Sequence, residues 1–308
     1  MRLNYILILP VIAVVIASGC TIPGMGGVTG GKGIIIESFE PDFSQIYSTE
    51  SVQFSLKLRN AGTVDGVVKD IQTTGVDWAQ GGFGGMGGGI CESAKGKMLP
   101  AVPDKGITGE TKSCTWTLSP KADEVPDGLS VTFYPVARVT YHYSTSTAKS
   151  ITFGTSSELR SIQDRGGTLP ADTVSTTSGP IAIDIVSKGP IRVSEAGVEF
   201  PIEIKITNVG GGIPCTDCSS SENWNKINLE VKTGDLQPTE GSCDEREVSL
   251  WRGKDNTIGC KLKVTSSGLT GRVQKIITVT ADYDYIIDAT TSVTVTGQSS
   301  SSAGELSW

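Results

Sequence analysis

Residues 52–62 read VQFSLKLRNAG, and residues 200–210 read FPIEIKITNVG. Both stretches alternate apolar and polar residues before they reach an Asn-x-Gly turn, at Asn60 and at Asn208. A period of two over about eight residues predicts a strand with one buried face, and Asn and Gly tolerate the left-handed backbone of a turn. The chain therefore carries the same strand and turn twice, which indicates an internal repeat.

A second block is repeated further along the chain. Residues 131–153 align without a gap to residues 273–295, and the shared tyrosines pair as Tyr141 with Tyr283 and Tyr143 with Tyr285. We expect a hairpin in each copy, with the turns at STSTA (144–148) and IIDAT (286–290). The four tyrosines are expected to face the core.

The remaining pattern indicates an all-β chain. Each copy opens with an apolar strand, IIIESF from Ile34 and PIAIDIV from Pro180, and the 308 residues include 38 Gly with little helical periodicity. We expect two tandem immunoglobulin-like antiparallel β-sandwiches, at 34–155 and 178–297. The polar segment 156–177 is expected to be a linker that lets the two sandwiches reorient.

A family resemblance supports this organisation. FSLKLRNAGTVDG (54–66) and PIEIKITNVGGG (201–212) resemble the strand and turn of CARDB-type immunoglobulin-like domains, which occur on bacterial and archaeal surface proteins. The resemblance implies an adhesion, scaffold or spacer role on a prokaryotic, specifically archaeal, cell surface.

The N-terminus has the layout of a secretory signal. Residues 1–19 contain one basic residue and thirteen mostly apolar residues from Tyr5 to Ala17. Ala17-Ser18-Gly19-Cys20 resembles a lipobox, which implies that residues 1–19 are removed and that Cys20 carries lipid. Residues 20–33 then form a Gly-rich tether, and residues 298–308 a disordered tail. An uncleaved membrane anchor is the alternative.

The other cysteines predict disulfides. If Cys20 takes lipid, six remain, and an even number suits an exported protein. Cys91 and Cys114 occupy the same places in the first copy as Cys243 and Cys260 in the second, so each pair is expected to staple its own sandwich. Cys215 and Cys218 lie in an insertion of the second copy and are expected to form a third disulfide. A zinc site, a redox pair and crossed pairing among the last four cysteines are alternatives.

Two further groups of residues are candidate contacts. Phe83 and Met86 lie in a Gly-rich segment, for which we expect a disordered surface loop and keep a hydrophobic contact with a partner or the membrane as the alternative. Asp282, Asp284 and Asp288 alternate near the end of the chain, where we expect a solvated face and keep calcium binding as the alternative.

Composition narrows the function. His142 is the only histidine, which removes most catalytic triads and histidine metal sites, and the net charge of −7 argues against nucleic acid as a partner. We expect a non-catalytic surface lipoprotein without cofactor or metal, bound to the membrane through lipid. Its partner would be another surface protein or an envelope polymer. The alternatives are a subunit that polymerises by strand addition through residues 34–39, and a metal or redox protein that uses the CxxC insertion.

Overall fold

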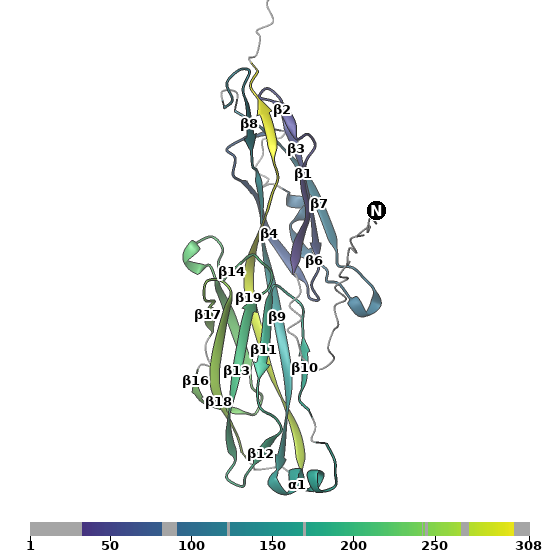
Figure 1. Cartoon of the computed structure of the whole chain (residues 1–308), viewed down its shortest axis with the longest axis vertical. Helices are drawn as coiled ribbons and strands as arrows, with labels where there is room; N and C mark the ends of the chain where they lie inside the picture. The colour runs from purple at the N-terminus through teal and green to yellow at the C-terminus, as the bar shows by residue number, and fades with distance from the viewer. Residues whose placement is uncertain are drawn as a thin grey trace, which may run out of the picture.

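The structure is a computed structural model that describes residues 33–81, 91–121, 124–168, 171–241, 243, 246–265 and 271–298. Cys20, the signal segment, Phe83, Met86 and the tail beyond Gln298 lie outside the described residues, as does the tether except Gly33. The predicted all-β antiparallel architecture is confirmed. Figure 1 shows an elongated molecule with an upper and a lower lobe, and α1 (Ser156–Asp164) lies at the lower end.

Each lobe has an outer sheet of four strands in the same order. In the upper lobe the order is β1 (Ile34–Pro41), β3 (Val52–Asn60), β7 (Thr111–Ser119) and β5 (Ala79–Gly81). In the lower lobe it is β11 (Ile181–Val186), β13 (Val198–Asn208), β18 (Asp255–Val264) and β16 (Gln237–Gly241). The repeated motif forms the central strands β3 and β13, whose alternate residues are buried as their period predicts.

The inner sheet combines strands of both repeats. Its path is β17 (Glu247–Ser249), β15 (Lys226–Lys232), β19 (Arg272–Thr290), β9 (Val136–Thr155), β4 (Gly66–Thr74) and β6 (Gly96–Met98). Three short strands pair beside this path: β10 (Thr173–Thr176), β12 (Ile191–Val193) and β14 (Ile213–Cys215). A sheet at the upper tip contains β2 (Gln45–Tyr47), β20 (Val293–Thr296) and β8 (Ser130–Phe133). Three single-turn 3-10 helices complete the elements: η1 (Glu92–Ala94), η2 (Pro103–Lys105) and η3 (Ser221–Asn223).

The predicted hairpins are wrong. STSTA and IIDAT do not turn, because β9 and β19 run straight through them and pair antiparallel with each other over all nineteen residues of β19. Neither segment contains Gly, Pro or Asn, and β-branched residues favour extended backbone. Thr145 and Thr147 continue the buried face inside the supposed turn, where their hydroxyls bond Tyr283 Oη at 2.6 Å and the Ile183 carbonyl at 2.9 Å.

Pairing of the long strands exchanges segments between the repeats. The second half of β9 pairs with the first half of β19 in the lower lobe, and β20 from the second repeat pairs with β8 of the first at the upper tip. A boundary between residues 155 and 178 therefore does not separate the lobes. The prediction of a reorienting linker is also wrong, since β10 in this segment pairs with β9 and Leu159 of α1 is buried.

Both lobes share one hydrophobic core. Buried residues of the outer sheets, such as Leu56 and Ile204, and of the inner sheet, such as Val139 and Val279, belong to a single cluster. The four tyrosines lie within it, each no more than 1% exposed, which confirms their predicted inward orientation. The two repeats thus fold as one interlocked unit.

Candidate functional site

The two repeats meet along the pairing of β9 with β19. Tyr143 lies opposite Tyr283, and Tyr141 lies opposite Tyr285. In the repeat alignment the equivalent pairs are Tyr141 with Tyr283 and Tyr143 with Tyr285, so the strands pair the tyrosines in the opposite order. His142 lies between the tyrosines of β9 and faces Asp284, its own equivalent in the aligned repeat. This pair therefore marks the centre of an approximate two-fold relation between the repeats.

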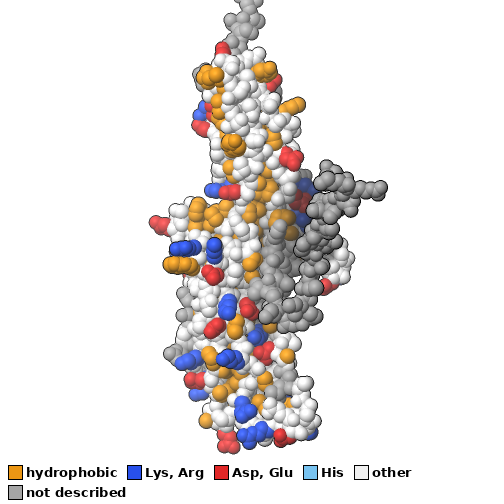
Figure 2. Space-filling view, in the orientation of Figure 1, with side chains coloured by type: hydrophobic (Ala, Val, Ile, Leu, Met, Phe, Trp, Pro, Cys, Tyr) orange, Lys and Arg blue, Asp and Glu red, His pale blue; other side chains and the backbone are white. Residues whose placement is uncertain are grey.

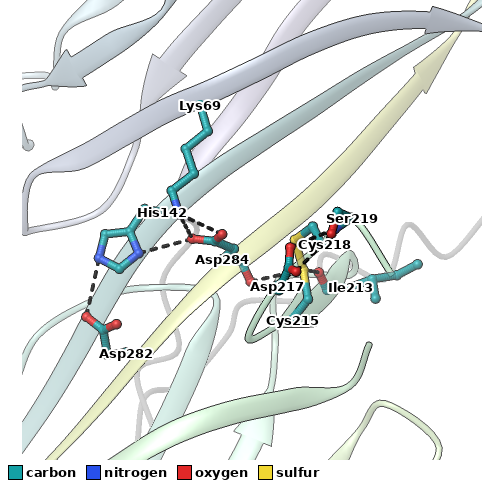
Figure 3. A network of polar contacts seen from close by, with 9 residues as sticks. All are labelled: Lys69, His142, Ile213, Cys215, Asp217, Cys218, Ser219, Asp282 and Asp284. Carbon is teal, nitrogen blue, oxygen red and sulfur yellow. Dashed lines mark hydrogen bonds and ion pairs between the residues drawn. A yellow bond between two sulfur atoms is a disulfide. The ribbon is translucent and has the colours of Figure 1, made fainter. Parts of the chain in front are cut away.

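A polar cluster surrounds this central pair. Lys69 Nζ lies 2.6 Å from Asp284 Oδ1 and 2.7 Å from Oδ2, and His142 Nδ1 lies 3.1 Å from Asp284 Oδ1. The other imidazole nitrogen, Nε2, lies 3.3 Å from Asp282 Oδ2. Figure 3 shows the imidazole between the two carboxylates and the lysine approaching Asp284 from β4. The cluster thus joins β4, β9 and β19.

A β-bulge positions Lys69. The register between β4 and β9 shifts between Val68 and Asp70, and Lys69 is the extra residue. At the corresponding place in the second repeat, the insertion that contains the CxxC separates β14 from β15. The repeats therefore differ at their junction, and this difference lets a lysine of one repeat reach an aspartate of the other.

The cluster is stabilised as charged groups. The hydrogen bond to Asp284 raises the pKa of His142 above its ordinary value, against the opposing effect of partial burial. Burial alone would raise the pKa of Asp284, but the hydrogen bonds from His142 and Lys69 outweigh it and lower that pKa. The carboxyl side chain of Asp284 is only 11% exposed, whereas that of Asp282 is 52% exposed. Asp284 is therefore the anchor of the cluster, and Asp282 is a solvated second partner.

The CxxC disulfide lies directly beside this cluster. Cys215 pairs with Asp284 across β14 and β19, and Cys215 is bonded to Cys218. The loop between them folds on itself, because Asp217 accepts hydrogen bonds from the backbone and hydroxyl of Ser219. Figure 3 shows the disulfide and this loop on the Asp284 side of the cluster. The insertion thus covers one side of the junction.

The other predicted disulfides also form. Cys91 is bonded to Cys114 and Cys243 to Cys260, and the latter cysteine of each pair lies on the equivalent strands β7 and β18. The pairing resolves the crossed alternatives. It also removes the thiolates that the zinc alternative requires, and no group of three or more His, Cys, Asp or Glu within the described ranges is placed to hold a metal ion.

The three aspartates do not form one solvated face. Asp288 accepts two hydrogen bonds from the Arg138 guanidinium, at 2.9 and 2.7 Å, while Asp284 is buried in the junction cluster. Asp282 and Asp288 are exposed as expected, although Asp288 is paired with Arg138. The expectation of a solvated face is therefore wrong for Asp284, because its partners lie on strands distant in sequence.

The Asn-x-Gly motif has a role that the sequence did not reveal. Asn208 Nδ2 donates to the Gly212 and Gly253 carbonyls, both at 2.9 Å, and its Oδ1 accepts from Gly210 N and from Tyr285 Oη. Asn60 makes the equivalent backbone contacts in the upper lobe. The recurrence of Asn at the ends of both strands was the feature of the sequence that could have predicted this role. These amides fix the loops that flank the junction.

The cluster is suited to holding the lobes together. Both imidazole nitrogens are engaged by carboxylates, so a substrate would have to displace one of them before His142 could act as a base. The ion pairs instead connect the two repeats through side chains that are partly shielded from water. In the part of the chain that the structure covers, no helix is long and apolar enough to cross a membrane.

Comparisons with known proteins add little to this description. No protein family matches the chain, and no curated protein matches it. Among solved structures, the collagen adhesin from S. aureus is similar at 10% sequence identity, with 87% of this chain and 93% of the adhesin covered and a TM-score of 0.14. A likeness this weak carries no argument about function.

Proposed function

We propose that this chain is a non-catalytic surface lipoprotein that acts as a rigid adhesion or envelope-scaffold module. The observation that supports the proposal best is the uninterrupted pairing of β9 with β19, which ties both lobes into one rod. A rod of fixed shape can hold binding surfaces at a set distance from an anchor, which two freely jointed domains cannot do.

Three disulfides suit such a role outside the cytoplasm. Two of them close 23-residue and 17-residue separations, and each contributes about 3 kcal/mol in the loop-entropy description. Disulfides persist in oxidising compartments, in agreement with the secretory signal expected at residues 1–19. The partner would be another surface protein or an envelope polymer.

The anchor would attach at the junction of the lobes. Gly33, the first described residue, packs against Pro180 and Tyr141 beside the crossing strands. With lipid on Cys20, the intervening residues could span about 45 Å at full extension. Both tips of the rod would then be available to partners.

Strand addition through residues 34–39 has less support. In the structure β1 pairs with its own neighbour β3, from Ile34 opposite Asn60 to Pro41 opposite Phe54. A polymer built as predicted would have to break these pairs first.

Intact mass of the protein extracted from native membranes tests the proposal. Thiols are alkylated before and after reduction, so one measurement counts lipid and free thiols together. We expect a chain that begins at lipid-modified Cys20, with six thiols labelled only after reduction. A chain that retains residues 1–19, or that carries no lipid, would contradict the anchoring. A matched Cys20→Ser variant should lose the lipid mass and leave the membrane fraction.

A further inference from the structure

The upper tip gathers exposed aromatic side chains. Four aromatic residues of the described part are strongly exposed, namely Phe43, Tyr47, Tyr134 and Trp251. Three of the four lie in or directly beside the tip strands β2 and β8, where Leu129 is also 56% exposed. Figure 2 shows separate hydrophobic side chains among mostly uncharged atoms over this part of the molecule. Exposed apolar groups concentrated in one place mark interaction surfaces.

A ladder of hydroxyl groups lies on the same sheet. Thr132 Oγ1 lies 3.0 Å from Thr294 Oγ1, and Ser130 Oγ lies 2.9 Å from Thr296 Oγ1. The register of β2 against β20 places Gln45 beside Thr294 and Tyr47 beside Thr296.

Alternation assigns these side chains to one face. Ile46 and Val295, the residues between them, are buried in the core. Because successive side chains of a strand point to opposite faces, Gln45 and Tyr47 share the outer face with the hydroxyls. We call this set the tip face; it comprises Gln45, Tyr47, Ser130, Thr132, Thr294 and Thr296. Phe43 and Tyr134 flank it, two residues beyond Gln45 and Thr132.

The charge of the tip face favours an uncharged ligand. None of its six side chains carries a charge at neutral pH, and the whole chain has a net charge of −7. An anionic polymer would meet no cation on this face and a repulsive field around it. A neutral ligand with many hydroxyl groups matches both the hydroxyl ladder and the absence of charge.

The lower lobe shows what the equivalent face looks like when the chain itself covers it. There, Arg192 of β12 and Arg272 of β19 flank Gly154 in the positions that Tyr47 and Ser130 occupy around Thr296. Leu159 of α1 packs so closely on Gly154 that an added Cβ would lie 2.9 Å from Leu159 Cδ2. This lobe therefore carries two arginines and a helix where the tip face is neutral and exposed.

We infer that the tip face binds a neutral polysaccharide. Sugar rings would stack their C–H faces on Tyr47 and the flanking aromatic rings, and their hydroxyls would exchange hydrogen bonds with the Ser, Thr and Gln side chains. Tyrosine suits this task because it presents a rigid ring with a polar end. The inference names the envelope polymer of the proposed function, so it rests on that proposal for its biological setting.

Affinity electrophoresis of the full mature chain tests the inference. Native gels contain mannan, dextran or laminarin as neutral probes, and chondroitin sulfate as the anionic probe. We expect retardation by at least one neutral polymer and none by the polyanion. The Tyr47→Ala/Tyr134→Ala double variant should bind about tenfold more weakly, because it loses the binding free energy of two aromatic stacking contacts. Trp251→Ala, which removes the exposed aromatic outside the tip, is the matched control and should bind like the parent.

Two results would overturn the inference. One is the absence of retardation by every neutral polymer, and the other is equal retardation of the double variant and the parent. Melting curves of each variant verify folding, and Thr132→Val/Thr294→Val removes hydroxyls at nearly constant volume as a second route. Lipid on Cys20 is measured separately by intact mass. Failure of the proposed lipid anchor can therefore be distinguished from failure of polysaccharide binding at the tip face.

Discussion

His142 and Asp284 face each other at the position where the two repeats exchange strands, and they are equivalent positions of those repeats. A perfect repeat would place two identical side chains opposite each other here, and two histidinium or two aspartate groups would repel. The present pair attracts, and Lys69 adds a second cation to the aspartate. The difference between the two copies at this position therefore stabilises the pairing of β9 with β19.

The imidazole of His142 should titrate above its ordinary pKa of about 6.5. Since it is the only histidine, its ring protons can be followed by NMR without assignment. The folded state holds this proton more tightly than the unfolded state does. The stabilising contribution is thus complete below about pH 6.5 and is lost as the pH rises through the folded pKa.

Asp284→Asn should move the titration midpoint of His142 downward, because it removes the charge that favours the imidazolium. A midpoint at or below 6.5 in the parent protein would contradict the described contact. The pKa of Asp284 is itself lowered, so its contribution is present above about pH 4 and is lost as the pH falls through its folded pKa.

Asp284→Ala should lower the free energy of unfolding by about 1–3 kcal/mol, because Lys69 and His142 both lose a shielded charged partner. Asp282→Ala is the control on the same strand. Its carboxylate is half exposed, so its loss should stay within about 0.5 kcal/mol. Urea unfolding at pH 6 measures both. Equal losses for the two variants would show that burial does not distinguish these carboxylates.

Removal of the disulfides should cost unequal amounts. Cys91→Ala/Cys114→Ala releases a separation of 23 residues and should cost about 3 kcal/mol, whereas Cys215→Ala/Cys218→Ala releases a separation of 3 and should cost about 2 kcal/mol. Denaturant midpoints give the order. Peptide mapping without reduction checks the pairing itself, and any peptide that links Cys218 to Cys243 would refute it.

Cleavage between the repeats should leave the molecule intact. A protease site inserted after Gly167 follows α1 in the sequence and lies outside the segments of β9 and β19 that pair with each other. After cleavage, the two fragments should co-elute in native size exclusion and separate only in denaturant, because each lobe contains strands of both. A cut placed before Gly33 is the control, since it should release only the N-terminal segment. Separation of the repeats without denaturant would favour independent domains.

Local sequence patterns were sufficient for part of this fold. The period of two in residues 52–60 predicts a half-buried strand wherever that strand lies, and β3 confirms it. The disulfides followed from the matched places of their cysteines in the two copies. Such features depend on neighbours in sequence or on the repeat, and both are visible in the chain itself.

The exchange of strands depends on long-range partners that no local pattern specifies. Thr145 and Thr147 look like turn residues, yet Tyr283 and Ile183 satisfy their hydroxyls in the core. Lys69 likewise finds Asp284 across the junction between repeats. A repeat whose strands could pair within one copy or between two copies has the same periodicity in both cases, so the pattern could not distinguish them.

The position of Gly33, beside the paired strands β9 and β19, has a mechanical consequence for an anchor on its N-terminal side. An anchor there would attach the rod near its middle, and the attachment point would act as a pivot. A partner that pulled on the upper tip would then exert a torque about the pivot. The continuous pairing of β9 with β19, which runs through both lobes, would transmit that load from one lobe to the other.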